Sequence, residues 1–341
     1  MKRFGYLVFL LMLPALLLGC EKNASRQDFL MDTMAEISIY DSNNKEIVDR
    51  AFDRLYEIEK RMSKTISASD VSKINRQAGR DWLEPSQESY ELIERALEFA
   101  ELTEGAFDPT IGPLVDLWQI KEDHTREDIP SPEDIKGARD LVNYRELVLR
   151  DGAVMLKREG MGLDLGGIAK GYGADEAKKV LLEAGVNSAL IDLGGNIYAL
   201  GEKTNGEAWK IGIQNPSLEA DSNRPIGVVS VRDKSIVTSG GYERFFKLGD
   251  RVYHHILDSR TGYPAESPFL SVTIVSDTSR DGDALATAFY VLGLEKTKEI
   301  LRQLEGIDVI IQDKSGRIYI SQGLENSFKA TDEETIVELI N

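Results

Sequence analysis

The 341-residue sequence has one cysteine and three histidines, and these shortages exclude several kinds of site. A single Cys cannot form a disulfide framework, and it cannot supply the several thiolates of a Cys-rich zinc or iron–sulfur centre. Basic residues are also in the minority, since 41 Lys and Arg stand against 58 Asp and Glu, for a formal net charge of -17. Nucleic-acid-binding proteins need a basic surface for the phosphates, so this composition argues against that class.

The sequence lacks the repeated long apolar runs of a polytopic membrane protein, and its 42% hydrophobic and 29% charged residues are typical of a globular chain. One apolar run, 4–18, follows Lys2 and Arg3. It is short for a membrane span, which needs about 20 residues, and it is typical of a secretory signal. It ends in Leu17-Leu18-Gly19-Cys20, which resembles the lipobox of bacterial lipoproteins. An ordinary signal peptide with an unrelated Cys is the alternative.

This N-terminus predicts the organisation of the chain and its location. We expect a lipoprotein signal peptide at 1–19, lipidation of Cys20, and a short polar tether at 20–28. A globular region at 29–322 and a C-terminal tail or helix at 323–341 would follow. The protein would then be lipid-anchored at the extracytoplasmic face of the bacterial cell membrane.

The pattern of apolar residues predicts a fold with both helices and strands. The alternation of Ala35, Ile37 and Ile39 indicates a half-buried strand, and helical spacing indicates helices near 47–62 and 86–103. Asn43 and Glu46 resemble a capping box. The second half is richer in strands, at 189–193, 209–214, 227–232 and 271–276, with helices near 167–184 and 281–292. The prediction is therefore an α+β fold of mixed, largely antiparallel sheets with flanking helices, and a ligand site between the two parts.

Two glycine-containing segments could hold a ligand. The first, 105–113, carries two glycines and two prolines, which make a rigid loop; it could equally be a helix connector. The second, 163–175, enters a helix, where backbone N–H groups and the helix dipole favour an anion, and Lys170 could add a cation for a phosphate. Neither nucleotide-binding fingerprint is present in the second segment.

Two further segments carry titratable side chains. Residues 253–262 hold His254 and His255 together with Asp258, and alternation along a strand would send the two rings to opposite faces. In 281–288, Asp283 and Thr287 are i, i+4 neighbours on a helix, and their oxygens suit a hard cation such as Mg²⁺. The alternative is that Asp281 or Asp283 only caps that helix.

Together these segments resemble the ApbE family of FAD:protein FMN transferases, which are often bacterial lipoproteins. The resemblance runs from about Met31 to Gln322 and keeps the family's order of motifs. The motifs are Met31-Asp-Thr33, Gly105-Ala-Phe-Asp-Pro-Thr110, Asp164-Leu-Gly-Gly-Ile-Ala-Lys-Gly171, Asp192-Leu-Gly-Gly-Asn196, Thr238-Ser-Gly-Gly241, His255-Ile-Leu-Asp-Ser-Arg-Thr-Gly262 and Asp283-Ala-Leu-Ala-Thr287. The resemblance implies a T-fold-like α+β architecture with FAD between its parts.

The resemblance also implies an activity. The family splits the FAD pyrophosphate with Mg²⁺, releases AMP and leaves FMN in phosphodiester linkage to a Thr or Ser hydroxyl of a partner. The usual acceptors are flavoproteins of membrane electron-transfer complexes. No acceptor-like motif Asp-x-Ser-Gly-Ala-Thr occurs in this sequence, so the acceptor is expected to be another chain.

Residue by residue, the resemblance assigns three kinds of role. Asp283, Thr287 and the backbone carbonyl of Gly167 match metal ligands, and His255 matches a residue important for transfer. The FAD-contacting positions are matched by Met31, Thr65, Ala106, Phe107, Asp108, Asp164, Lys170 and His254. His255 would be the general base, with Asp258 or Asp164 as the alternative. Ser259 stands where the family commonly has Pro.

Other functions remain open at this stage. A magnesium-dependent FAD pyrophosphatase would use the same residues with water as the acceptor. A non-catalytic flavin- or solute-binding lipoprotein would share the signal peptide and the length, but would need no metal ligands. A serine hydrolase using Ser239 and His255 would lack the G-x-S-x-G elbow.

Overall fold

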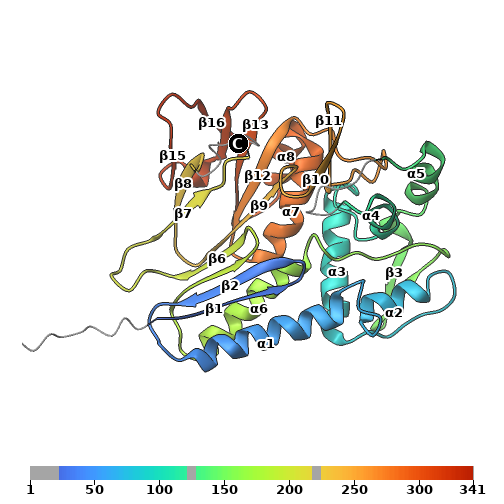
Figure 1. The fold of residues 1–341 in the computed structure, drawn as a ribbon, viewed down its shortest axis with the longest axis horizontal. Coiled ribbons are helices and arrows are strands. Elements are labelled where there is room, and N and C mark those ends of the chain that lie inside the picture. The colour runs from blue at the N-terminus through green and yellow to red at the C-terminus, as the bar shows by residue number, and fades with distance from the viewer. Residues whose placement is uncertain (1–22, 121–127, 217–223, 341) are drawn as a thin grey trace, which may run out of the picture.

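A nine-stranded sheet forms the centre of the protein in a computed structural model, which describes residues 23–120, 128–216 and 224–340 (Figure 1). The strand order is β1-β2-β5-β6-β9-β12-β13-β14-β16. Neighbours are antiparallel, except that β16 runs parallel to β14. The strands are β1 (Ala24–Leu30), β2 (Thr33–Ile39), β5 (Ser188–Leu193), β6 (Asn196–Gly201), β9 (Lys234–Gly240), β12 (Phe269–Ser276), β13 (Ile307–Asp313), β14 (Ile318–Ser321) and β16 (Val337–Ile340). The predicted α+β class with largely antiparallel sheets is confirmed.

Three long helices cover one face of this sheet. They are α1 (Lys45–Met62), α6 (Ala169–Glu183) and α7 (Ser279–Leu292). The apolar stripe of α1 packs with β1, β2, β5 and the small residues of α6 in one core cluster, so the predicted amphipathic helix is confirmed. Its N-cap is Asn44, whose side chain accepts the Glu46 N–H, and not Asn43 as the sequence suggested.

Helix α7 lies against β9 and β12, beside α6. Its own N-cap, Thr278, makes no side-chain hydrogen bond. Asp175 of α6 takes over this role, because its carboxylate accepts the backbone N–H groups of Ser279 and Arg280 at 2.9 and 3.0 Å. An acidic side chain from a neighbouring helix thus satisfies the first turn of α7 and fixes the two helices relative to one another.

We expect Gly171→Ala to destabilise the protein by about 2 kcal/mol or more, as overpacked cores do. A Cβ at Gly171 would lie 2.3 Å from the Ser279 carbonyl oxygen, so α6 and α7 would have to separate. Urea unfolding measures the effect. Gly137→Ala, in α5 (Pro132–Arg139), is the control because a Cβ there meets nothing within 4 Å. Equal stability of the two variants would contradict the prediction.

The opposite face of the sheet is covered at its centre by a second, three-stranded sheet of order β15-β8-β7. Its strands are β7 (Trp209–Ile213), β8 (Gly227–Val231) and β15 (Phe328–Ala330). Trp209, Ile211 and Val229 share a core cluster with Ile236 and Ile310 of the large sheet. The two sheets therefore form a β-sandwich in this part of the molecule.

Helix α8 (Leu294–Leu301), which follows α7 in the chain, packs on α7.

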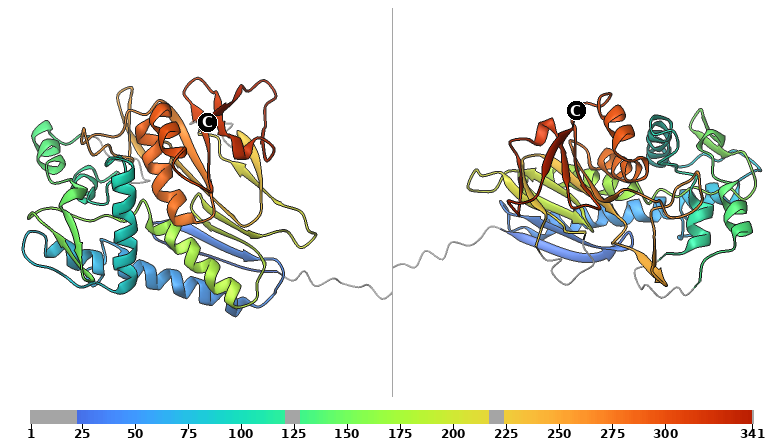
Figure 2. Two further views of the ribbon diagram at one scale, coloured as in Figure 1. Left: turned by 180° about the vertical axis from the view of Figure 1, so that it is seen from behind. Right: turned by 90° about the horizontal axis from the view of Figure 1, so that it is seen from above.

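The helices that lie between α1 and α6 in the sequence gather at one end of the molecule, beside α7 and the main sheet (Figure 2). They are α2 (Asp70–Arg76), α3 (Gln87–Leu102), α4 (Gly112–Trp118), α5 and the 3-10 turn η1 (Tyr144–Glu146). Two hairpins join them, β3 (Leu147–Arg150) with β4 (Ala153–Leu156), and β10 (Phe245–Leu248) with β11 (Arg251–His254). The β10–β11 hairpin packs on α4 and α5, where Trp118 donates its indole N–H to the Gly262 carbonyl at 2.7 Å.

Two predicted boundaries are wrong. Residues 24–28, expected as tether, belong to β1, because Ala24 pairs with Ile39 at the edge of the sheet. Residues 323–341, expected as tail or helix, contain the end of the 3-10 turn η2 (Gln322–Leu324) and the strands β15 and β16, which pair with β8 and β14. The predicted signal peptide and Cys20 lie outside the described residues. Within the described ranges, no helix has the length and apolarity required to span a bilayer.

Candidate functional site

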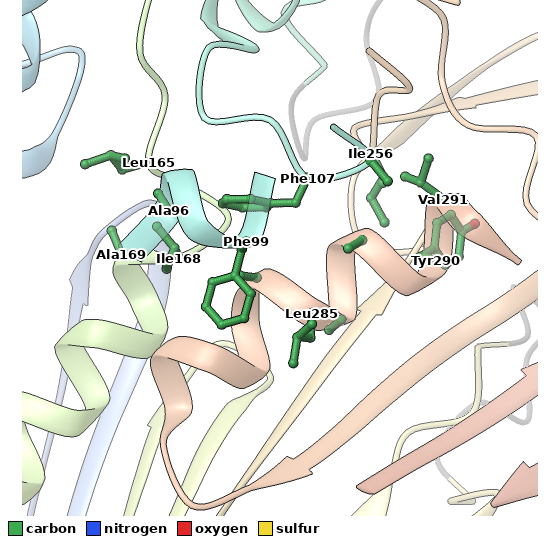
Figure 3. Packing of buried hydrophobic residues seen from close by; sticks show 14 of the residues in the cluster. Ala96, Phe99, Phe107, Leu165, Ile168, Ala169, Ile256, Leu285, Tyr290 and Val291 are labelled. Carbon is green, nitrogen blue, oxygen red and sulfur yellow. The ribbon is translucent and has the colours of Figure 1, made fainter. Parts of the chain in front are cut away.

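Four predicted segments meet where α6 begins and α7 passes beside it. A Cβ at Gly167 would lie 3.2 Å from the Phe107 ring and 3.7 Å from the Thr287 hydroxyl oxygen. The Asp283 carboxylate reaches the same corner, 3.7 Å from the Lys170 ammonium. Figure 3 shows Phe107 between Ile168 and Ala169 on one side and Ile256 on the other, above α7. The fold therefore brings together residues that are more than a hundred positions apart in the chain.

Asp283 is the buried carboxylate of this site, with 3% of its surface exposed. One oxygen, Oδ2, accepts the Gly171 N–H at 2.9 Å, and the other faces Lys170 beyond hydrogen-bonding distance. Thr287 lies one turn later on α7, beside the backbone of Gly167. The alternative of a simple cap is excluded, because Thr278 occupies the N-cap and Asp283 lies inside the helix.

This arrangement fits a hard cation. A carboxylate oxygen, a hydroxyl and a backbone carbonyl are the oxygen ligands that Mg²⁺ accepts, with water completing the shell. The described residues contain no group of three or more His, Cys, Asp or Glu that could bind a metal. The residues that the sequence predicts would form a different kind of site, with a single carboxylate.

The loop after α3 is held by Asp108, which is 8% exposed. Its carboxylate accepts the N–H and the hydroxyl of Thr110 at 2.8 and 2.7 Å, and the Tyr144 N–H at 3.1 Å. Burial raises the pKa of Asp108, and these hydrogen bonds offset only part of that effect. Asp108 thus fixes the loop that presents Ala106 and Phe107, both 5% exposed, toward α6.

Asp164 is fixed from two sides. Its Oδ1 accepts the Gly166 N–H at 2.8 Å, and its Oδ2 lies 3.1 Å from the ammonium of Lys64. Burial lowers the pKa of Lys64, but the carboxylates of Asp164 and Asp116 outweigh it and raise that pKa above its ordinary value. Lys64 is a site residue that the sequence reasoning missed. Its neighbour Thr65 is exposed, with its hydroxyl 2.9 Å from that of Ser63.

Met31 occupies the two-residue turn between β1 and β2. Met31 and Asp32 both have positive φ, 52° and 58°, as a tight antiparallel hairpin requires. The Met31 N–H donates to the Glu59 carboxylate at 2.7 Å, and its sulfur would lie 3.4 Å from a Cβ at Gly173 of α6. The turn is thereby fixed beside the start of α6, where Lys170 lies.

The two histidines have different hydrogen-bond partners. His254 Nε2 lies 3.1 Å from the Ala265 carbonyl, and Nδ1 has no hydrogen-bond partner among the described residues. His255 Nδ1 lies 3.3 Å from the Arg244 carbonyl oxygen. Because a carbonyl only accepts, the neutral His255 ring carries its proton on Nδ1 and keeps a lone pair on Nε2.

Burial sets the protonation state of both rings. It lowers the pKa of His254 to about 4. Burial, followed by the positive charges of Arg244, His254 and Lys170, lowers the pKa of His255 to about 3. With this pKa the His255 ring is neutral near pH 7. The His255 residue as a whole is only partly buried.

These depressed pKa values predict lower stability in acid. Below the unfolded pKa of about 6.5, the unfolded chain binds protons that the folded protein does not, so the free energy of unfolding falls as the pH drops. Between pH 6.5 and 5 we expect His254 to contribute a loss of about 1 to 2 kcal/mol. Urea unfolding at the two pH values checks this, and His254→Gln should reduce the loss. An unchanged loss in that variant would contradict the assignment.

Asp258 binds Arg260 and stabilises the turn at 258–262. Its two oxygens accept hydrogen bonds from the backbone N–H, Nε and Nη2 of Arg260, each at 2.9 Å. Its carbonyl accepts the Gly262 N–H and closes the turn. The geometry therefore favours His255 over Asp258 as the base. Ser259, where the family commonly has Pro, donates its hydroxyl to the Gly105 carbonyl at 2.8 Å and joins this loop to the one after α3.

A family model and several curated relatives match most of this chain. A sequence model of the ApbE family matches residues 31–311. A relative from Treponema pallidum (strain Nichols), named FAD:protein FMN transferase, is 37% identical over 92% of this chain and 91% of its own length. A relative of the same name from Klebsiella pneumoniae (strain 342) is 37% identical over 89% of this chain and 93% of its own length.

Solved structures show the same fold. The ApbE protein of Thermotoga maritima is 34% identical, with a TM-score of 0.79 over 87% of this chain and 96% of that one. The flavin transferase ApbE of Vibrio cholerae is 26% identical, with a TM-score of 0.80 over 89% of this chain and 99% of that one. Fold, motif order and sequence identity agree, and this chain belongs to the ApbE family.

Proposed function

We propose that this protein is a FAD:protein FMN transferase. It would transfer FMN from FAD to a Thr or Ser hydroxyl of a partner flavoprotein and release AMP. The observation that carries the proposal is the meeting of Asp283, Thr287 and Gly167 with Lys170 and Phe107 in one corner of the fold. Relatives that are 37% identical over most of their length bear this name.

The oxygen ligands and the charged side chains have complementary roles in this proposal. Asp283, Thr287 and the Gly167 carbonyl would hold Mg²⁺, which when bound neutralises charge on the pyrophosphate oxygens and orients the phosphorus. Lys170 lies beside this site and offers an ammonium to the same anion. Met31, Thr65, Ala106, Phe107, Asp108, Asp164 and His254 are the proposed FAD contacts.

The transfer step then needs a base for a weak nucleophile. The acceptor hydroxyl oxygen attacks the FMN phosphorus, its proton passes to Nε2 of His255, and the bond from phosphorus to the AMP oxygen breaks. A base within hydrogen-bonding reach contributes roughly 10²–10⁴-fold to such a step. The Arg244 carbonyl holds the ring proton on Nδ1, which leaves the lone pair of Nε2 to accept this proton and supports the role of His255.

The proposal also covers where the protein acts and which kind of protein accepts the FMN. Lipidation at Cys20 would anchor the protein to the extracytoplasmic face of the cell membrane, close to membrane-bound acceptors of electron-transfer complexes. Its net charge of -17 favours a basic docking patch on the acceptor. Binding to the acceptor that does not weaken with added salt would argue against such a patch.

Incubation of the purified protein with FAD, Mg²⁺ and a peptide that carries the acceptor motif tests the activity. Mass spectrometry detects FMN on the peptide, and chromatography detects AMP. We expect both products, and their loss on removal of Mg²⁺ with EDTA. AMP with free FMN and no labelled peptide would instead indicate a FAD pyrophosphatase. Bound FAD without turnover would indicate a flavin-binding lipoprotein.

A further inference from the structure

Arg244 connects two parts of the site that come from opposite ends of the chain. Its guanidinium Nη2 donates to the carbonyl oxygen of Asp32 at 2.8 Å, across 212 residues of sequence. Asp32 belongs to the positive-φ turn whose other member, Met31, packs beside the start of α6. The side chain of Arg244 therefore holds this turn on the side of the β10–β11 hairpin, while Glu59 holds it on the side of α1.

The backbone of Arg244 acts on His255. Its carbonyl oxygen accepts both the His255 backbone N–H at 3.0 Å and the ring Nδ1–H at 3.3 Å. This pair of bonds continues the β10–β11 register, in which Phe245 faces His254, by one further residue. One residue thus fixes both the position and the tautomer of the proposed base, and at the same time holds the Met31 turn.

We propose that Arg244 is a positioning residue for the transfer reaction, because it fixes His255 and the Met31–Asp32 turn relative to one another. The expected effect on the transfer rate rests on the proposed function. The hydrogen bond from Arg244 to the Met31–Asp32 turn does not depend on catalysis. No motif assigns Arg244 a role, and the contact with Asp32 cannot be read from the sequence.

The charge of Arg244 has a second effect on His255. The charged or titratable groups that act on the His255 ring are Arg244, His254 and Lys170, and each disfavours its protonation. Removal of the guanidinium removes one of these charges, so the pKa of His255 would rise toward its ordinary value. The pH at which the ring becomes protonated would then move upward, while burial, the largest cause, still keeps this pKa below its ordinary value.

Two variants of the full-length protein separate the hydrogen bond to Asp32 from the positive charge of Arg244. Arg244→Gln removes the guanidinium donor and the charge, whereas Arg244→Lys keeps the charge but loses the planar donor. FAD affinity, measured by the quenching of flavin fluorescence, is expected to weaken about 10-fold in both. Transfer to the acceptor peptide is expected to slow about 10- to 100-fold at pH 7, the range found for residues that orient a reactive group. The acidic limb of the pH–rate profile should move to higher pH in Arg244→Gln and stay in place in Arg244→Lys.

Arg251→Gln is the matched control on the same hairpin. Arg251 pairs with the exposed Glu266 at 2.8 Å, and its side chain is 58% exposed. It should keep wild-type FAD affinity and transfer. Wild-type FAD affinity in Arg244→Gln, an equal loss in Arg251→Gln, or identical pH profiles of the two Arg244 variants would each overturn the proposal. A wild-type protein that binds FAD without transfer would refute the proposed function, while the affinity measurements would still test the hydrogen bond to Asp32.

Discussion

Replacement of Asp283 by Asn is expected to lower the rate of AMP release from FAD by about 10³-fold or more. Removal of a single group that stabilises developing charge costs roughly 10²–10³ in rate, and Asp283 would act on both a metal and the adjacent cation Lys170. An Asn side chain keeps an oxygen that can accept the Gly171 N–H, so the contact between α6 and α7 is preserved. Chromatographic assay of AMP at increasing Mg²⁺ measures the loss.

Asp281 provides the control for this prediction. It lies half a turn earlier on α7 and pairs with Arg95 of α3 at 2.8 Å. Asp281→Asn should weaken that ion pair and leave the Mg²⁺ dependence of AMP release unchanged. If Asp283→Asn keeps a Mg²⁺-dependent rate close to that of the wild type, the proposed metal site is wrong.

Much of the fold could be predicted because its elements carry local signals. The helix at 47–62 has a clear apolar stripe, and Ala35, Ile37 and Ile39 are buried in β2 while the residues between them are partly exposed, as the alternation predicts. Helix α8 and strand β9 were not predicted. Strand β9 is buried on both faces for much of its length, at Ser235, Ile236 and Val237, so it shows no alternation. The C-terminal strands were missed because a three-residue strand such as β15 is too short to show a period.

The residues of the site likewise fall into those that local spacing predicts and those that only the tertiary structure brings together. Asp283 and Thr287 could be paired from the sequence because helical spacing places i and i+4 on one face. The tie between Lys64 and Asp164, or between Arg244 and Asp32, depends on tertiary packing across 100 or 212 residues, and no local spacing encodes it. The assignment of Asp258 as an alternative base failed to anticipate Arg260, because a nearby carboxylate and guanidinium bond only once the turn at 258–262 is formed.

His255→Ala is expected to slow transfer to the acceptor by about 10²–10⁴-fold and to leave FAD affinity within a few-fold of the wild type. The ring donates Nδ1–H to a backbone carbonyl, so its loss removes one hydrogen bond and the base but no FAD contact that the motifs assign. Stopped samples analysed by mass spectrometry give the rate of FMN attachment, and flavin fluorescence gives the affinity.

Chemical rescue distinguishes a base from a structural residue at this position. His255→Ala removes the ring from a residue that is only partly buried, and we expect added imidazole to occupy the space that it leaves. Imidazole has a pKa close to 7 and can accept the acceptor's proton, whereas a purely structural loss would not respond to it. We expect partial recovery that rises with imidazole concentration and with pH. Asp258→Asn should slow transfer less than His255→Ala, because both Asp258 oxygens already bind Arg260. The reverse order, with no rescue by imidazole, would move the general base to an aspartate.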